Sequence, residues 1–177
     1  ELKAGGYPIA QRCFLGSDLV FDLDRTQKIN GEEIVYDWET VRTDALHIIR
    51  HMEREQEFTF WGVWFSGRNG LHIRYYQEEP YVESDPIARR EIYKILREKL
   101  INRLPDLSTL DKDITIDPFR ITKIPDTFDM STGFKVQYIP LEKLRTSSMN
   151  TILESIERCD EISSHRDGPM GHRQKLE

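Results

Sequence analysis

Two extended runs joined by a very short link are the feature that most constrains the fold. Residues 58–65 (FTFWGVWF) and 71–76 (LHIRYY) are rich in aromatic and β-branched side chains, and only the link SGRNG separates them. So short a link joins antiparallel strands, because a parallel pair needs a crossover of about a dozen residues or more. The sequence therefore predicts an antiparallel pair of strands here.

Apolar residues at helical spacing flank this pair on both sides. Before it, within residues 38–56, they recur at steps of three and four: Trp38, Val41, Ala45, Ile48, Ile49 and Met52. After it, Asp85-Pro86 supplies an N-cap and a first-turn proline for a second periodic set: Ala88, Ile92, Ile95, Leu96 and Leu100. We expect an amphipathic helix in each segment.

The remaining extended runs complete the order of elements. Residues 17–24 (SDLVFDLD) predict the first strand, followed by the polar segment RTQKINGEE with its Asn30-Gly31 turn. The fourth strand is either ITID (114–117) or GFKVQYI (133–139), and a C-terminal helix is expected at about 148–163. The order β-α-β-β-α-β predicts an α+β fold of the ferredoxin-like, RRM-like plan. In this plan the first and third strands lie side by side at the centre of an antiparallel sheet.

Length and composition bound the organisation of the chain. Its 177 residues suit one domain, which we place at residues 1–165 with a core at about 17–145, followed by a disordered tail at 166–177. The segment from 104 to 132 is long for a connection, and such loops are usually functional or disordered. Two distant cysteines, Cys13 and Cys159, build neither a disulfide framework nor a cysteine-rich zinc site.

Charge and hydropathy restrict the partners. The net charge of −6 argues against coating nucleic acid by bulk attraction, so a polyanion must meet a local basic surface. No run reaches the ~20 apolar residues of a membrane span, and the start of the sequence lacks the pattern of a signal peptide. We therefore expect a cytoplasmic protein without a membrane partner.

Alternation along the first strand places two carboxylates on one face. Leu19, Phe21 and Leu23 point to the helices, while Asp22 and Asp24 point to the other side. Two carboxylates roughly 6 to 7 Å apart on one strand suit one or two divalent ions. Taken alone, a D-x-D pair is more often a solvated pair at a strand end.

The third predicted strand adds an imidazole and a cation to the same face. Alternation along residues 71–76 points His72 and Arg74 outward. If the first and third strands are neighbours, these side chains share one open surface with the two carboxylates. Phosphoryl transfer needs such a set, because metals bridge the phosphate oxygens and basic groups neutralise the triphosphate. A lone histidine or an SGRNG turn has an ordinary structural explanation, and the predicted topology is what brings them together.

Three segments carry a resemblance to a known family. LVFDLD (19–24), FSGRNGLHI (65–73) and TIDPFRITKIPDTFDMSTGFKV (115–136) resemble, in order and spacing, the three motifs of the archaeal and eukaryotic primase superfamily. Within this superfamily, the segments resemble in particular the small catalytic subunit of archaeal-type DNA primases. The resemblance implies a primase-polymerase core and a nucleotidyltransferase that synthesises or extends an RNA or DNA primer on a template from nucleoside triphosphates, using Mg²⁺ or Mn²⁺. It also implies nucleic acid and a large primase subunit, or other replication or repair proteins, as partners.

The resemblance assigns roles by position. It implies that Asp22, Asp24 and Asp117 are the catalytic acids and the metal ligands. The residues that it implies for nucleotide binding are Ser66, Arg68, His72, Arg120 and Lys123.

The chain also departs from the family. Asp129 and Ser131 stand where a histidine and a lysine meet the triphosphate, which removes charge-assisted contacts of ~1.5 to 3 kcal/mol each. The family's zinc module is missing. These departures keep two alternatives open: a catalytically impaired, primase-like nucleic-acid-binding module, and the polymerase domain of an end-joining repair system. A nucleotidyl cyclase fits less well, because its corresponding turn is acidic and SGRNG is basic.

The course of a template is not fixed by the motifs. Basic residues on the two predicted helices usually serve solubility. Aromatic side chains on the second and third strands have the chemistry to stack on bases, although such residues more often pack in a core: Trp61, Trp64, Tyr75 and Tyr76.

Overall fold

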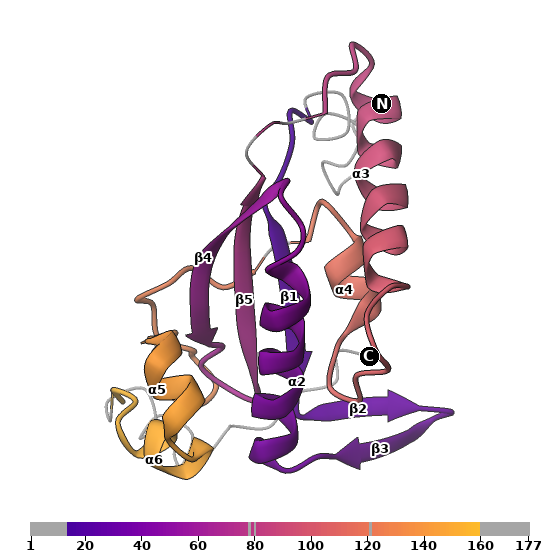
Figure 1. Cartoon of the computed structure of the whole chain (residues 1–177). Helices are drawn as coiled ribbons and strands as arrows, with labels where there is room; N and C mark the ends of the chain where they lie inside the picture. Colours follow the sequence, from indigo (N-terminus) through magenta and orange to yellow (C-terminus); the bar gives the residue numbers. More distant parts are fainter. Residues whose placement is uncertain (1–13, 78, 80, 121, 160–177) are drawn as a thin grey trace, which may run out of the picture.

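The computed structural model describes residues 14–77, 79, 81–120 and 122–159, which form an α+β structure. One antiparallel sheet has the strand order β1-β5-β4-β6 (Figure 1). Its strands are β1 (Leu19–Asp24), β4 (Phe58–Phe65), β5 (Gly70–Gln77) and β6 (Tyr138–Ile139). A separate hairpin projects near the lower end of β1 and consists of β2 (Thr26–Ile29) and β3 (Glu32–Val35). The helices are α2 (Trp38–Met52), α3 (Pro86–Ile101), α4 (Lys112–Ile116), α5 (Leu141–Thr146) and α6 (Met149–Glu154).

The predicted antiparallel pair is confirmed as β4 and β5. Ser66 closes its link, because its backbone N–H donates to the Gly70 carbonyl (2.9 Å) and its Oγ accepts the Gly70 N–H (3.0 Å). Gly67 has a φ of +81°, a conformation that favours glycine. A Cβ at Gly70 would overlap the Leu23 carbonyl group, so glycine is what allows β5 to lie against the end of β1.

Both predicted helices form, and α3 has the expected N-cap, Asp85. The Asp37 carboxylate accepts the Thr40 N–H at the start of α2 (2.7 Å), and Asp85 caps α3 immediately before Pro86. Helix α2 ends at Met52, four residues before the predicted end. These caps fix where each helix begins, because they satisfy backbone N–H groups that have no partner within the helix.

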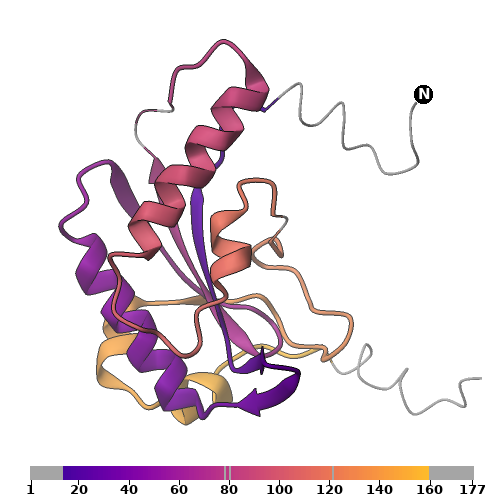
Figure 2. The same ribbon diagram turned by 90° about the vertical axis from the view of Figure 1, so that its right-hand side faces the viewer.

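The core lies between the sheet and the helices. Leu19, Phe21 and Leu23 of β1 and Leu71 and Ile73 of β5 are all 0% exposed, as the alternation predicts. Helix α2 packs on this face, with its apolar stripe in the same cluster. In the edge-on view of Figure 2, the chain that follows α4 lies on the opposite side of the sheet from α2. This second face carries the polar residues of β1 and β5.

The topology differs from the ferredoxin-like plan in one respect. The first and third predicted strands are neighbours, as expected, but β1 is at the edge of the sheet and not at its centre. The fourth strand, β6, pairs with β4 at the other edge. The place beside β1 is taken by a short stretch around Leu110, which forms a single antiparallel bridge to Leu23.

Three local predictions need correction. The segment ITID is not a strand, because Asp111 caps the one-turn helix α4 and accepts the Ile114 N–H (2.9 Å). Of GFKVQYI, only β6 joins the sheet. The polar segment after β1 is not merely a turn but the β2–β3 hairpin.

The helix predicted at 148–163 corresponds to the shorter α6, and an additional short helix, α5, precedes it. The last residues of that prediction and the predicted tail at 166–177 lie outside the described residues. Within the described ranges, none of the helices has the length and apolar character needed to cross a bilayer.

Candidate active site

A cavity of about 250 Å³ lies on the polar face of the sheet, between the ends of β1 and β5 and the segment that follows α4. Seven of the eight predicted site residues line it, and Asp117 does not. The lining residues are Asp22, Asp24, Ser66, Arg68, Asn69, His72, Ile114, Arg120, Thr122 and Lys123. The three segments that carry the family resemblance thus meet at one place.

The two β1 carboxylates form the acidic side of this cavity. Burial, followed by the charges of Asp24 and Asp111, raises the pKa of Asp22 to about 7, and Arg120 and Lys123 oppose this only in part. Burial, followed by the charge of Asp111, also raises the pKa of Asp24. Both carboxyl groups therefore lie where a negative charge is poorly stabilised, and a cation bound between them would relieve the repulsion.

His72 lies directly across from Asp22 in the β1–β5 register. Its Nε2 atom is 3.4 Å from Asp22 Oδ1. Burial, with the charges of Arg74 and Lys123, lowers the pKa of His72 to about 4, so the imidazole is neutral at physiological pH. Its Nδ1 atom is buried and has no hydrogen-bond partner among the described residues. The Nε2 edge of a neutral ring therefore faces the Asp22 carboxyl group in the lining of the cavity.

Cationic side chains form the opposite side. Arg68 reaches in from the link between β4 and β5 and is exposed, while Arg120 and Lys123 come from the chain after α4. The Lys123 ammonium donates to the Ser66 carbonyl oxygen (3.0 Å) and is also bonded to Asp129. Carboxylates and cations thus face each other across the same small volume, an arrangement suited to a ligand that carries both a metal ion and phosphates.

Asp129 has a role that its position in the third motif did not predict. Its carboxylate accepts the backbone N–H groups of Ser131 (2.8 Å) and Thr132 (3.1 Å), which fixes the turn that ends at Gly133. Burial alone would raise the pKa of Asp129, but hydrogen bonds from Lys123 and Ser131 lower it to about 2. Asp129 therefore holds Lys123 at the edge of the cavity.

Asp117 is not brought to the two β1 carboxylates. It follows the last turn of α4, where its Oδ1 accepts the Phe119 N–H (3.0 Å), and its charge acts on Arg97 of α3. The acid whose charge acts on both Asp22 and Asp24 is Asp111. The predicted trio of acids is therefore not assembled, and Asp111 is the third carboxylate near the pair.

Sequence reasoning missed Asp111 because ITID was one of two candidates for the fourth strand and the resemblance assigns the third acid to Asp117. The Asp111 N–H donates to the Asp22 carbonyl oxygen (2.8 Å), which fixes the start of α4 against β1. An aspartate three residues before Ile114 is a sequence pattern for an N-cap and could have indicated this helix. Asn69 and Thr122, two further polar residues of the cavity, lie within segments that the resemblance already covered.

Within the described part of the chain, no group of three or more His, Cys, Asp and Glu side chains is arranged to hold a metal ion by itself. A Mg²⁺ ion in a nucleotide site is commonly bound by one or two carboxylates, with waters and substrate phosphates as its other ligands. The pair Asp22 and Asp24 supplies the oxygen ligands that such an ion prefers.

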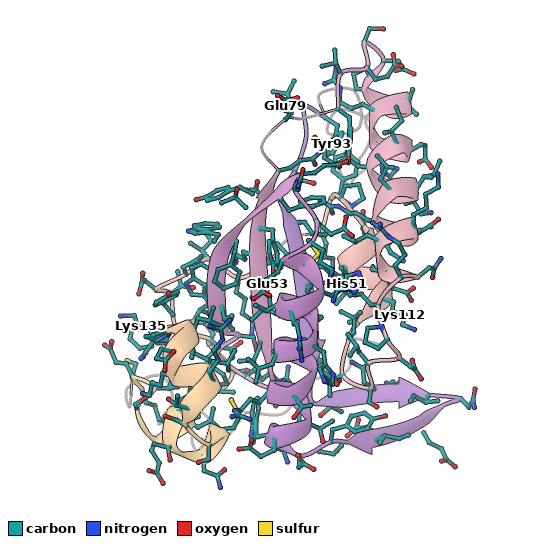
Figure 3. The ribbon with its side chains drawn as sticks, in the orientation of Figure 1. His51, Glu53, Glu79, Tyr93, Lys112 and Lys135 are labelled. Atoms are coloured by element: carbon teal, nitrogen blue, oxygen red, sulfur yellow. The ribbon has the colours of Figure 1, made fainter. Side chains whose placement is uncertain are left out.

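A larger cavity, of about 530 Å³, lies elsewhere, between α3 and the adjoining ends of α2, β4 and β5. Tyr93, on the side of α3 that faces the sheet, is one of its lining residues (Figure 3). Its charges are mixed, with Glu55 bonded to Arg103 (3.2 Å). None of the eight predicted site residues lines this cavity.

Comparison with known proteins adds no relative: no family model, curated protein or solved structure matches the chain.

Proposed function

We propose that the chain is a metal-dependent nucleotidyltransferase with a primase-polymerase core, which synthesises or extends a primer on a nucleic-acid template from nucleoside triphosphates. The observation that supports this most is the cavity in which Asp22 and Asp24 face three cationic side chains on the open face of an antiparallel sheet. Two-metal phosphoryl transfer needs this combination of carboxylates and cations within reach of one triphosphate.

The donor set fits Mg²⁺ or Mn²⁺. Asp22 and Asp24 would hold the ion, and Asp111 adds negative charge beside them. When bound, such an ion lowers the pKa of an attacking hydroxyl and stabilises the charge on the phosphates. Oxygen ligands favour these ions over zinc, which prefers nitrogen and sulfur.

The chain's own residues bind and orient the nucleotide. Arg68, Arg120 and Lys123 neutralise the triphosphate through charge-assisted hydrogen bonds. The neutral His72 imidazole lies with its Nε2 atom 3.4 Å from Asp22 Oδ1 and helps to position that side chain. Ser66 acts by closing the link that carries Arg68.

Primer extension tests this proposal. The native chain is incubated with Mn²⁺, labelled nucleotides and a primed template, beside Asp22→Asn and the control Asp106→Asn, whose side chain is 98% exposed. We expect extension by the native chain and the control, and a loss of about 100-fold or more in Asp22→Asn. No extension by the native chain, or equal extension by Asp22→Asn, removes the proposal.

A comparison of two further variants tests which acid is the third. Asp111→Asn should slow extension much more than Asp117→Asn, because only Asp111 adds its charge to the β1 pair. Asp117 is expected to matter indirectly, through the turn that leads to Arg120. If Asp117→Asn slows extension more than Asp111→Asn, Asp111 is not the third acid of the site. The roles proposed for the residues of the first two motifs are unaffected by that result.

A nucleic-acid-binding module without catalysis is the second candidate, and the bond between Lys123 and Asp129 favours it. This bond occupies one of the cations that would meet the triphosphate. Such a module should bind an oligonucleotide equally well with Mn²⁺ and with EDTA, as measured by fluorescence anisotropy, and should extend no primer. The proposed enzyme should instead bind nucleoside triphosphate more tightly when Mn²⁺ is present.

A further inference from the structure

An aromatic cluster covers the polar face of the sheet next to the cavity. It consists of Trp61 and Trp64 of β4, Tyr76 of β5 and Tyr138 of β6. The Trp61 and Tyr76 rings are stacked, with centroids 4.8 Å apart and planes 23° apart. Trp64 contacts Trp61 at 5.1 Å and Tyr138 at 5.4 Å in edge-on arrangements. Three of the four rings remain well exposed, at 39% for Trp61, 42% for Tyr76 and 47% for Tyr138.

Two features of β4 build this cluster. The pairing with β5 shifts between Phe60 and Gly62, so Trp61 is an extra residue in the strand. This bulge leaves Trp61 on the same face as Trp64, where strict alternation from Trp64 would have turned it inward. Gly62 is also required, because a Cβ there would come within 2.8 Å of both the Trp64 and the Tyr138 rings. The rings therefore lie close over the strand backbone.

A cation supports the cluster from within the sheet. The Arg74 guanidinium carbon lies 5.5 Å from the centre of the Trp61 ring and 5.4 Å from that of Trp64. The same group donates to Thr122 Oγ1 (3.2 Å) and to the Lys123 carbonyl oxygen (2.7 Å). Arg74 thus ties the aromatic rings to the segment after α4, which carries three of the cavity's lining residues.

Strand register places the cluster and the cavity in one cross-strand row. Asp22 lies opposite His72, His72 opposite Trp64, and Trp64 opposite Tyr138. With about 4.8 Å between neighbouring strands, this row spans roughly 14 Å from the carboxylate to the outermost ring. His72 and Trp64, in the middle of this row, are buried at 5% and 6% exposure, so a strand with its end in the cavity would meet the exposed rings of Trp61, Tyr76 and Tyr138 beyond them.

We infer that the aromatic cluster is the binding surface for a single-stranded nucleic acid that leads into the cavity. That the nucleic acid leads into the cavity rests on the proposed function. That it binds to the rings rests on the geometry of the cluster alone. Exposed rings stack on bases of any sequence, and the cations of the adjoining cavity, Arg68, Arg120 and Lys123, attract the phosphates. A protein partner is less well supported, because an exposed surface next to three cations is a better match for a polyanion.

Fluorescence anisotropy with a labelled oligothymidylate, at low salt and in EDTA, tests the inference on the full chain. Trp61→Leu and Tyr138→Leu remove a ring and keep apolar bulk, while Tyr138→Phe keeps the ring. Ile95→Ala, on α3, removes an apolar side chain with the same 47% exposure as Tyr138 and serves as the control. Thermal unfolding of each variant shows whether it is folded.

The affinity should fall about tenfold in each leucine variant and stay unchanged in Tyr138→Phe and Ile95→Ala. Equal affinity in Tyr138→Leu and Ile95→Ala, or no binding by the folded native chain, overturns the inference. Because the assay contains neither a divalent metal ion nor a nucleoside triphosphate, its result is independent of that of primer extension. A chain that binds through these rings and extends no primer contradicts the proposed function alone.

Discussion

Replacing Asp22 by asparagine should change how the stability of the protein depends on pH. The pKa of Asp22 is raised from 3.8 to about 7, first by burial and then by the neighbouring acids. Between these two values the folded chain keeps a proton that the unfolded chain has lost. By linkage, the free energy of unfolding must therefore fall as the pH rises through this interval.

The size of the effect follows from the same two values. The gap between 3.8 and about 7 corresponds to on the order of 4 kcal/mol, lost between about pH 4 and pH 8. Asparagine does not ionise, so Asp22→Asn does not undergo this loss of stability. The variant should thus gain stability relative to the native chain as the pH rises, and be the more stable protein at about pH 8.

Urea unfolding at about pH 5 and pH 8, without divalent ions, measures this difference. His72 contributes in the opposite sense, because its pKa is lowered to about 4 and its stabilising effect is lost as the pH falls below 6.5. That contribution is present in both proteins and cancels in the comparison. Asp106→Asn controls for the loss of one negative charge at an exposed position.

Adding Mn²⁺ at about pH 8 completes the test. A ligand that binds only the folded state stabilises it by about 2.7 kcal/mol at one hundred times its dissociation constant. We expect this gain in the native chain and its absence in Asp22→Asn. A difference between the two proteins that is the same at both pH values and indifferent to Mn²⁺ would refute the reasoning.

Three further predictions follow from single contacts. Gly70→Ala should cost about 3 kcal/mol or more in urea unfolding, since the new Cβ overlaps the Leu23 carbonyl group and cannot move without separating β1 from β5; an unchanged midpoint would show that the strands are not held this closely. Asp44→Ala should cost about 2 to 4 kcal/mol, because the buried carboxylate accepts both the backbone N–H (2.9 Å) and the hydroxyl (2.8 Å) of Thr109, whereas a loss below 1 kcal/mol would mean that water replaces these bonds. Lys123→Met should raise the KM for nucleoside triphosphate by about 10- to 100-fold with a smaller change in kcat, and an unchanged KM would exclude Lys123 from nucleotide binding.

Periodicity predicted the parts of the fold whose residues are buried on one side. The alternation of Leu19, Phe21 and Leu23 and the helical stripe of α2 both describe surfaces that face the core. The β2–β3 hairpin was missed because its burial is slight on both faces, which leaves no apolar alternation to detect. Its Asn30-Gly31 turn, with φ of +52° and +86°, was the usable pattern.

The run ITID was a candidate for the fourth strand because isoleucine and threonine favour strands. The backbone there is decided by the Asp111 N-cap and by the hydrogen bond from Asp111 to β1, a contact between distant parts of the chain. A local pattern does not report such a contact. Asp117, to which the resemblance assigns the third acid, follows the helical turn of α4, where its carboxylate accepts the Phe119 N–H and does not lie beside the β1 pair.

The open face of the sheet was predictable as a site, but its extent was not. Register alone brings His72 across from Asp22, as the alternation indicated. The exposure of Trp61 depends on a bulge in β4, and that of Tyr138 on the pairing of β6, which the sequence left undecided. Tyr75, one of the four aromatic residues singled out in the sequence, is buried in the core at 2% exposure.

Anomalous diffraction from crystals soaked with Mn²⁺ and a nucleoside triphosphate is the most direct test of the central claim. The account predicts an anomalous peak bound by carboxylate oxygens of Asp22 and Asp24, with the triphosphate against Arg68, Arg120 and Lys123. Density for the nucleotide elsewhere, or no manganese between the two β1 carboxylates, would contradict it.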